Sequence, residues 1–168
     1  NPVTERAVID FNAFQQEAMA DCVAHLAHVV RQASGGRHLV FFFYGYQFEF
    51  GPMQTGPASC GHYALRRLLQ CPDIDILCSP TSYFDRKLGG SAPLMSPAES
   101  VALAGKLWLT EDDARTCLTE PEAGFGRVDT LEETCAVLRR NTAQCALRNF
   151  GTWWMDLGAT GWFDHPLF

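Results

Sequence analysis

Apolar residues recur along the chain at two spacings, and segments of the two kinds alternate. Near the N-terminus they fall every three or four residues, which is typical of one face of an amphipathic helix. We therefore predict a long helix over residues 10–33, ended by Gly35 and Gly36. Its expected apolar stripe consists of Val8, Phe11, Phe14, Ala18, Cys22, Leu26 and Val29.

Four short runs are apolar with little interruption. They are too short for helices and are typical of strands covered on both faces, as in a parallel sheet. They lie at residues 39–44, 74–78, 107–110 and 150–155. The stretches between them predict helices at residues 62–69, 96–104 and 131–147, and residues 47–59 and 79–90, rich in Gly, Pro and Ser, predict loops.

Two of these helices have sequence signals for their start. Ser96 followed by Pro97 and Glu99 predicts a cap with proline in the first turn. Thr130 with Glu133 three residues later predicts a capping box. Both signals support the placement of helices after predicted strands.

Alternating strands and helices predict an α/β fold with a parallel sheet and right-handed crossovers. An open doubly wound sheet and a (β/α)8 barrel both fit this order. No G-x-G-x-x-G or Walker motif follows a strand, and the longer loops follow strands, which favours the barrel. A whole barrel takes roughly 250 residues and eight strands. We therefore predict one domain over residues 1–168, a half-barrel with four parallel strands.

Composition excludes several function classes. The 168 residues are 47% hydrophobic and 19% charged, with a net charge of −6 and no basic stripe, so we expect no nucleic-acid partner. No apolar run approaches the roughly 18–20 residues of a membrane helix, so we expect no membrane partner. The chain starts at Asn1 and stops at Phe168 after a loop-like stretch, so we expect a piece of a longer protein.

The seven cysteines indicate a reducing compartment. Their number is odd and none forms a C-x-x-C pair, which does not suggest a disulfide framework. We expect a cytoplasmic location. Cys22, His25 and His28 follow one another at three-residue spacing, but this spacing drifts around a helix, so we favour packing and expect no metal or other cofactor.

The strand at residues 107–110 runs directly into Glu111, Asp112 and Asp113, with Arg115 next. The carboxyl ends of strands in α/β folds carry the chemistry, so Glu111 is a candidate active-site acid. A solvated loop start is the alternative interpretation. Glu49, after the first predicted strand, is a second candidate carboxylate, for which we favour a simple loop acid.

Several short motifs occur in the order found in large glycoside hydrolases. The sequence resembles the catalytic barrel of β-galactosidase-like enzymes, family 42 and its unclassified relatives in the retaining clan. The resemblance covers the whole chain, from the fourth helix through the eighth strand of such a barrel. The motifs are Tyr44-Gly45-Tyr46, Ser79-Pro80-Thr81-Ser82-Tyr83, Thr110-Glu111-Asp112-Asp113-Ala114-Arg115-Thr116 and Gly151-Thr152-Trp153-Trp154-Met155-Asp156-Leu157.

The resemblance implies roles for individual residues. Glu111 matches the nucleophile at the end of the seventh strand, and Tyr83 would hydrogen-bond it. Trp153 or Trp154 would form an aromatic floor for a sugar ring. The acid/base glutamate of the clan belongs to the fourth strand, before Asn1, so the resemblance implies a fragment that carries only the nucleophile half.

Physical chemistry adds further candidates. A carboxylate that must stay ionised needs a nearby cation, for which Arg86 and Arg115 are candidates. Asp156 can accept sugar hydroxyls, and Tyr46 is a further candidate for substrate binding. Neighbouring residues of a strand face opposite ways, so one of the two tryptophans must be packing.

Three functions remain open from the sequence. The first is a fragment of a retaining glycoside hydrolase with a carbohydrate substrate and little activity by itself. The alternative is a non-catalytic carbohydrate-binding or interaction module, and the third is an open doubly wound domain of another function. A half-barrel leaves strand edges open, so under either of the first two we expect a homo-oligomer that closes or covers the sheet.

Overall fold

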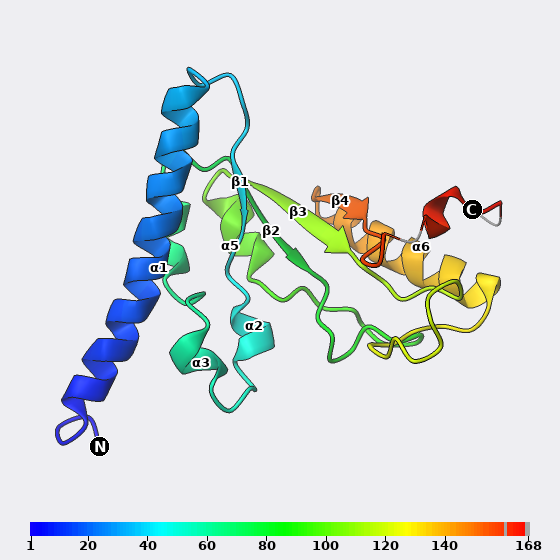
Figure 1. The fold of residues 1–168 in the computed structure, drawn as a ribbon, viewed down its shortest axis with the longest axis horizontal. Helices are drawn as coiled ribbons and strands as arrows, with labels where there is room; N and C mark the ends of the chain where they lie inside the picture. The colour runs from blue at the N-terminus through cyan, green and yellow to red at the C-terminus, as the bar shows by residue number, and fades with distance from the viewer. Residues whose placement is uncertain (160, 167–168) are drawn as a thin grey trace. The chain divides into compact units, whose positions relative to one another are not determined.

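The computed structural model describes residues 1–159 and 161–166. Its strands are β1 (Phe41–Phe43), β2 (Ile76–Pro80), β3 (Leu107–Asp112) and β4 (Gly151–Trp154), which form one sheet in the order β1-β2-β3-β4 (Figure 1). The pairs β1–β2 and β3–β4 are parallel. The predicted α/β class with four parallel strands is confirmed, and the arrangement is consistent with part of a barrel.

Contacts divide the chain into two compact units. The first contains Asn1–Cys78 and Ser96–Trp108, and the second contains Ser79–Met95 and Leu109–Phe168. The chain therefore passes from one unit to the other three times: within β2, between Met95 and Ser96, and within β3.

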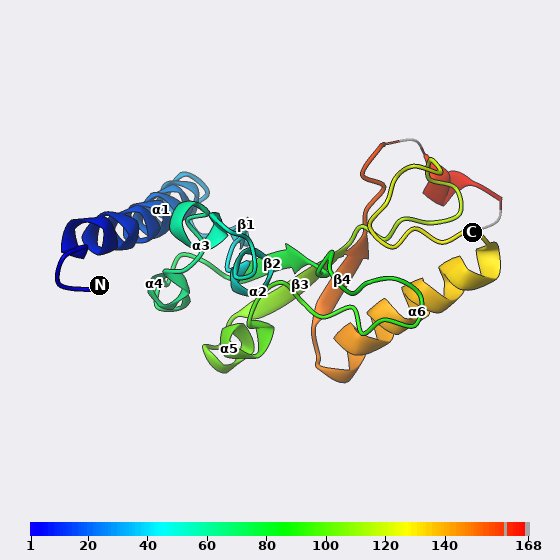
Figure 2. The ribbon, with the colours of Figure 1, turned by 90° about the horizontal axis from the view of Figure 1, so that it is seen from below.

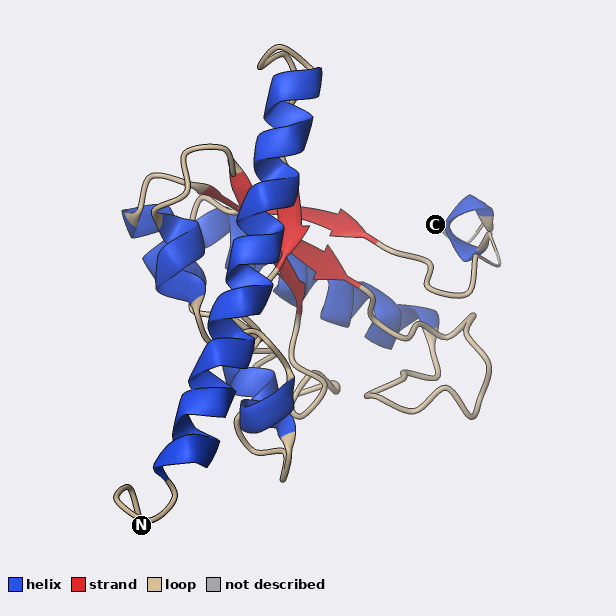
Figure 3. Ribbon diagram, turned by 60° about the vertical axis from the view of Figure 1, so that its left-hand side comes forward, coloured by secondary structure: helices blue, strands red, loops and turns tan. Residues whose placement is uncertain are grey.

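The first unit is built on the long helix α1 (Arg6–Ala33), seen at full length in Figure 3. It packs against α3 (Gly56–Ser59) and α4 (Leu65–Leu69). The predicted helix is confirmed, but the predicted stripe is wrong, because its large members are exposed. The buried face carries mainly small side chains, which allow close approach of the short helices; its members are Gln16, Ala20, Val23 and Ala27.

Two further predictions in this unit need correction. The segment predicted as a loop contains α2 (Gln47–Phe50) and α3. Its backbone is tied to neighbouring side chains, since Gln16 donates to the Pro57 carbonyl at 3.1 Å and Tyr63 donates to the Gln47 carbonyl at 3.1 Å. These long-range bonds carry no local sequence signal.

Helix α5 (Ala98–Leu103) is present, but Ser96 does not cap it. The N-cap residue is Pro97, without a side-chain cap bond. The Ser96 hydroxyl instead donates to the Tyr44 carbonyl at 3.5 Å. A distant backbone acceptor therefore replaces the local one that the sequence predicted.

The second unit contains α6 (Leu131–Leu147), which packs along β4 (Figure 2). The predicted capping box is confirmed: Thr130 Oγ1 accepts from the Glu133 N–H, and the Glu133 carboxylate accepts from the Thr130 N–H, each at 3.2 Å. A small apolar core lies beneath the helix and consists of Ala114, Val128, Val137 and Leu138. The 3-10 helix η1 (Trp162–Asp164) follows β4.

All seven cysteines carry free thiols. Among the helices of residues 1–159 and 161–166, none combines the length and apolar character that crossing a bilayer requires.

Candidate functional site

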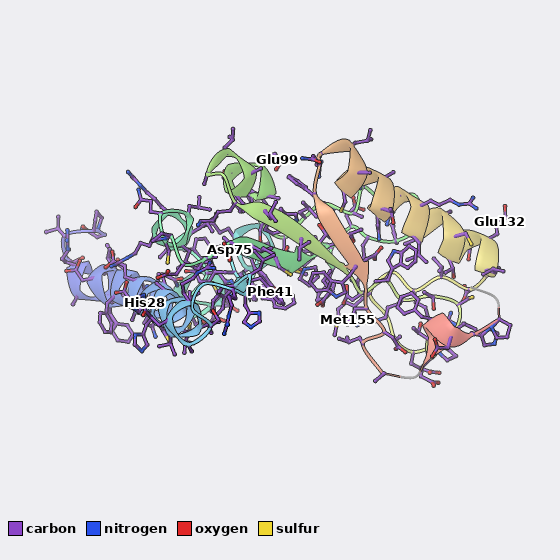
Figure 4. All side chains as sticks on the ribbon, turned by 90° about the horizontal axis from the view of Figure 1, so that it is seen from above. His28, Phe41, Asp75, Glu99, Glu132 and Met155 are labelled. Atoms are coloured by element: carbon purple, nitrogen blue, oxygen red, sulfur yellow. The ribbon has the colours of Figure 1, made fainter. Side chains whose placement is uncertain are left out.

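Glu111 lies near the end of β3, where this strand is paired with β4. Strand β3 continues past the predicted end at residue 110 to Asp112, and Glu111 is only 8% exposed. The register pairs Glu111 with Trp153 and Asp112 with Trp154. Beyond the strands the pairing continues, because the Met155 N–H donates to the Asp112 carbonyl at 2.9 Å. Figure 4 labels Met155 at this end of β4.

The two tryptophans point to opposite faces of the sheet. Trp154 stacks on Phe163 with ring centroids 6.0 Å apart and lines a cavity of about 710 Å³ along α6. Asp112 points the same way, since its Oδ1 accepts from the Asn141 amide of α6 at 2.9 Å. Strand alternation then places Glu111 and Trp153 together on the face that α6 does not cover.

Asp113 is the centre of a buried polar cluster next to Glu111. It is 0% exposed and forms an ion pair with the Arg86 guanidinium. The Tyr83 hydroxyl donates to Asp113 Oδ2 at 3.1 Å, and Arg115 Nη1 lies 3.6 Å from the same oxygen. The structure therefore brings three predicted site residues onto one carboxylate to which the sequence assigned no role.

Tyr83 is the member whose environment differs most from expectation. The resemblance implies a hydrogen bond from the Tyr83 hydroxyl to Glu111. In the structure this hydroxyl donates to Asp113, which follows Glu111 by two residues. Burial raises the pKa of Tyr83 to about 12, with the Asp113 charge adding to the effect. The hydroxyl therefore keeps its proton and acts as a hydrogen-bond donor at neutral pH.

Aromatic contacts complete this cluster. The Arg86 guanidinium carbon lies 4.3 Å from the centroid of the Tyr83 ring, and the Tyr83 and Phe125 rings are 4.9 Å apart. Phe125 holds a left-handed backbone with φ 48°, and its carbonyl accepts from Arg86 Nε at 2.8 Å. The strained backbone thus aims one more acceptor at Arg86.

The loop that carries Tyr83 and Arg86 is fastened to α6 by one side chain. Arg140 donates to the carbonyls of Arg86, Lys87 and Gly90, each at 2.8 Å. Burial of Arg140 lowers its pKa, while the charges of Asp112 and Asp85 oppose that shift. Arg140 carries no local signal in the sequence, because its acceptors lie some fifty residues away along the chain.

The pKa values of Glu111 and Asp112, the two carboxyl groups at the end of β3, are both raised. Burial and then the charge of Asp113 raise the pKa of Glu111. Burial raises the pKa of Asp112 to about 6, although hydrogen bonds from Asn141 and the Ala114 N–H oppose this. Glu111 therefore holds its proton to a higher pH than an exposed glutamate does.

A cavity of about 380 Å³ lies at the carboxyl ends of β3 and β4. It contains two predicted binding residues, Arg115 and Asp156; Glu111 is not among the described residues that line it. Asp156 Oδ2 accepts from the Gly161 N–H at 2.6 Å. The remaining lining residues are Ala114, Leu118, Thr119, Glu120, Ala123, Met155, Leu157 and Gly158.

Tyr46 and Glu49 belong to the first compact unit. The Tyr46 ring stacks on His62 with centroids 4.6 Å apart, and Glu49 is buried within α2. His62 Nδ1 accepts from the Gly45 N–H at 3.0 Å, and burial lowers the pKa of His62 to about 4. This aromatic group, with Phe50 beside it, follows β1 as the Glu111 cluster follows β3.

In the described part of the chain, no group of three or more His, Cys, Asp or Glu side chains is arranged to hold a metal ion. Comparisons of the sequence and the structure with protein-family models, curated proteins and solved structures found no match.

Proposed function

We propose that this chain carries the nucleophile half of a retaining, β-galactosidase-like glycoside hydrolase, with Glu111 as the nucleophile. The observation that supports this most is the pairing of Glu111 with Trp153 at the carboxyl end of a parallel sheet. The pair offers a buried carboxylate and an aromatic side chain on one face. A sugar ring stacks its apolar face on an aromatic ring, which leaves its anomeric carbon free for attack from the side.

The proposed reaction uses two carboxyl groups about 5–5.5 Å apart. Glu111 attacks the anomeric carbon and forms a glycosyl ester, while the second group protonates the leaving oxygen. That second group then takes a proton from a water molecule, whose oxygen bonds to the anomeric carbon as the bond to Glu111 breaks, which frees the sugar and restores the carboxylate. We propose that the second carboxyl comes from a segment outside these 168 residues, as the resemblance implies.

The other site residues bind and orient in this proposal. Arg115 and Asp156 line the cavity at the strand ends and are suited to bind sugar hydroxyls. Tyr83 and Arg86 act through Asp113, whose carboxylate contacts both. Tyr46 belongs to the first unit, and we propose it separately as an aromatic carbohydrate-binding residue of that unit.

A non-catalytic carbohydrate-binding module is the second candidate function. It is favoured by one observation: the described lining of the cavity with Arg115 and Asp156 does not include Glu111. In such a module the sugar is held by the cavity and by Trp153, and no bond is cleaved.

We propose a homo-oligomer as the form that covers the open edges of the sheet. β1 and β4 are its two edge strands, and Phe41 and Phe43 on β1 are exposed. Such edges promote association with other strands. A single monomeric species in sedimentation at micromolar concentration would contradict this proposal.

The free thiols favour a reducing compartment, and we propose the cytoplasm.

The experiment that tests the function is covalent labelling with a 2-deoxy-2-fluoro-β-galactosyl or -glucosyl donor that carries a dinitrophenolate leaving group. This leaving group departs without protonation, so the nucleophile half suffices. We expect mass spectrometry to find one fluorosugar on Glu111, and none on the Glu111→Gln variant.

Labelling at another residue, or none at Glu111, would overturn the assignment. Sugar binding that survives Glu111→Ala but is lost in Trp153→Ala, without labelling, would support the binding module instead. Full turnover of an ordinary aryl galactoside, abolished by Glu111→Gln, would show that the second carboxyl lies within these 168 residues.

A further inference from the structure

Asp113 stands out among the buried charges of the second unit because so many side chains converge on it. One carboxylate contacts Arg86, Arg115 and the Tyr83 hydroxyl, and none of its surface is exposed. These partners come from two segments, the loop after β2 and the residues directly after β3. Asp113 is therefore the point at which these two segments are joined.

The position of Asp113 relates it directly to Glu111. The two residues are separated by Asp112, the last residue of β3, whose side chain points toward Asn141 of α6. Asp113 directly follows the last residue of β3, so it lies at the same strand end as Glu111. The side chains gathered around Asp113 are consequently gathered at the strand end that carries Glu111.

We propose that Asp113 is a positioning residue for Glu111: its buried carboxylate holds Tyr83, Arg86 and Arg115 in fixed places beside the nucleophile. This inference rests on the proposed function, because it takes Glu111 to be the nucleophile. It adds a role for Asp113, to which the resemblance assigns none.

The cluster is costly in a way that a purely stabilising ion pair is not. Arg86 is only 3% exposed, yet its Nη2 atom has no hydrogen-bond acceptor among the described residues. An unpaired buried donor destabilises the folded state, and buried ion pairs add little net stability. Phe125 adds backbone strain at the carbonyl that binds Arg86. Such costs are typical of sites selected for geometry over stability.

The charges around Glu111 make this role measurable. The loop after β2 contributes Tyr83 and Arg86, the β3 segment contributes Asp112, Asp113 and Arg115, and α6 contributes Arg140 on the side of Asp112. The negative charge of Asp113 favours the protonated form of Glu111, whose pKa it helps to raise. Arg115, which contacts Asp113, offsets part of that charge.

The test is the titration of the Glu111 carboxyl carbon, followed by NMR in the whole chain and assigned with Glu111→Gln. We expect Asp113→Asn, which keeps the shape and removes the charge, to lower the Glu111 midpoint by about 0.5 pH unit or more. We expect Arg115→Gln to move the midpoint in the opposite direction, because Asp113 loses a compensating cation. Arg139→Gln, an exposed change on α6, serves as the matched control and leaves the midpoint in place.

Midpoints that stay the same in both Asp113→Asn and Arg115→Gln would overturn the inference. If Asp113→Asn does not fold, Arg115→Gln alone serves as the test, because Arg115 is less buried than Asp113. The titration needs no sugar. An unmoved midpoint therefore refutes the role of Asp113, whereas absent labelling of Glu111 refutes the glycosidase proposal.

Discussion

Glu111 and Trp153 occupy paired positions of β3 and β4, while the next pair, Asp112 and Trp154, faces α6. Each strand end thus supplies one residue to the face away from α6 and one to the face that α6 covers. The two tryptophans are therefore expected to have different roles, which substitution of each one can distinguish.

Trp153→Ala is expected to weaken binding of an aryl galactoside or glucoside by about tenfold, the size of one lost stacking contact. Trp154→Ala is the matched control. This side chain is 51% exposed and packs on Phe163, so its loss is expected to lower the free energy of unfolding by about 2 kcal/mol while binding is retained. Calorimetric titration and denaturant unfolding measure the two effects, and equal binding losses would contradict the assignment of faces.

Asp112 is expected to make the protein less stable as pH rises. Its pKa is about 6 in the folded chain, against 3.8 for an aspartate in its ordinary state, so the folded state binds the proton more tightly. The free energy of unfolding should fall by about 3 kcal/mol between pH 3 and pH 7 from this group. Urea unfolding at several pH values should show this slope reduced in Asp112→Asn.

Glu122→Gln provides the control for Asp112, because Glu122 is exposed in the loop between β3 and α6. Its stability profile should match that of the unmodified chain. An Asp112→Asn variant with an unchanged slope would show that another group dominates this pH range.

His62 is expected to act in the opposite direction. Its pKa is about 4 in the folded chain, against 6.5 for a histidine in its ordinary state, so the unfolded state binds the proton more tightly. The stability that the neutral ring contributes is present above pH 6.5 and is lost as pH falls toward 4. His62→Asn keeps a side-chain acceptor for the Gly45 N–H and does not titrate, so its unfolding free energy should lack this acid-side loss. A loss of the same size in the variant would exclude His62 as the source.

The capping box of α6 allows a prediction on stability alone. Thr130→Ala removes the acceptor of the Glu133 N–H and should lower the free energy of unfolding by about 1 kcal/mol. Thr130→Ser keeps the hydroxyl and should change it much less. Thermal or denaturant unfolding of the pair measures the difference, and equal losses would mean that the methyl group, not the cap, matters.

Periodicity and local capping rules predicted much of the fold correctly. The strands, the helix after Thr130 and the long first helix follow from patterns that lie within one segment. The buried face of α1 did not follow, because small residues such as Ala20 and Ala27 give a weaker apolar signal than the exposed Phe11 and Phe14. Close packing against short helices selects for size as well as polarity.

The candidate site was predictable only in part for a related reason. Glu111 is marked by its place directly after an apolar run, and this signal is local. Asp113 carries the same local signal, but its importance comes from Tyr83 and Arg86, about thirty residues earlier in the chain. A single sequence does not reveal which of three successive acids meets a buried guanidinium.

The three hydrogen bonds from Arg140 limit how the loop after β2 can be transferred to another protein. The segment with Tyr83 and Arg86 owes its shape to a guanidinium on a helix that follows much later in the sequence. Transplanting that segment into another scaffold would therefore require the helical arginine to be carried along. Any natural recombination between the two would have to inherit them together.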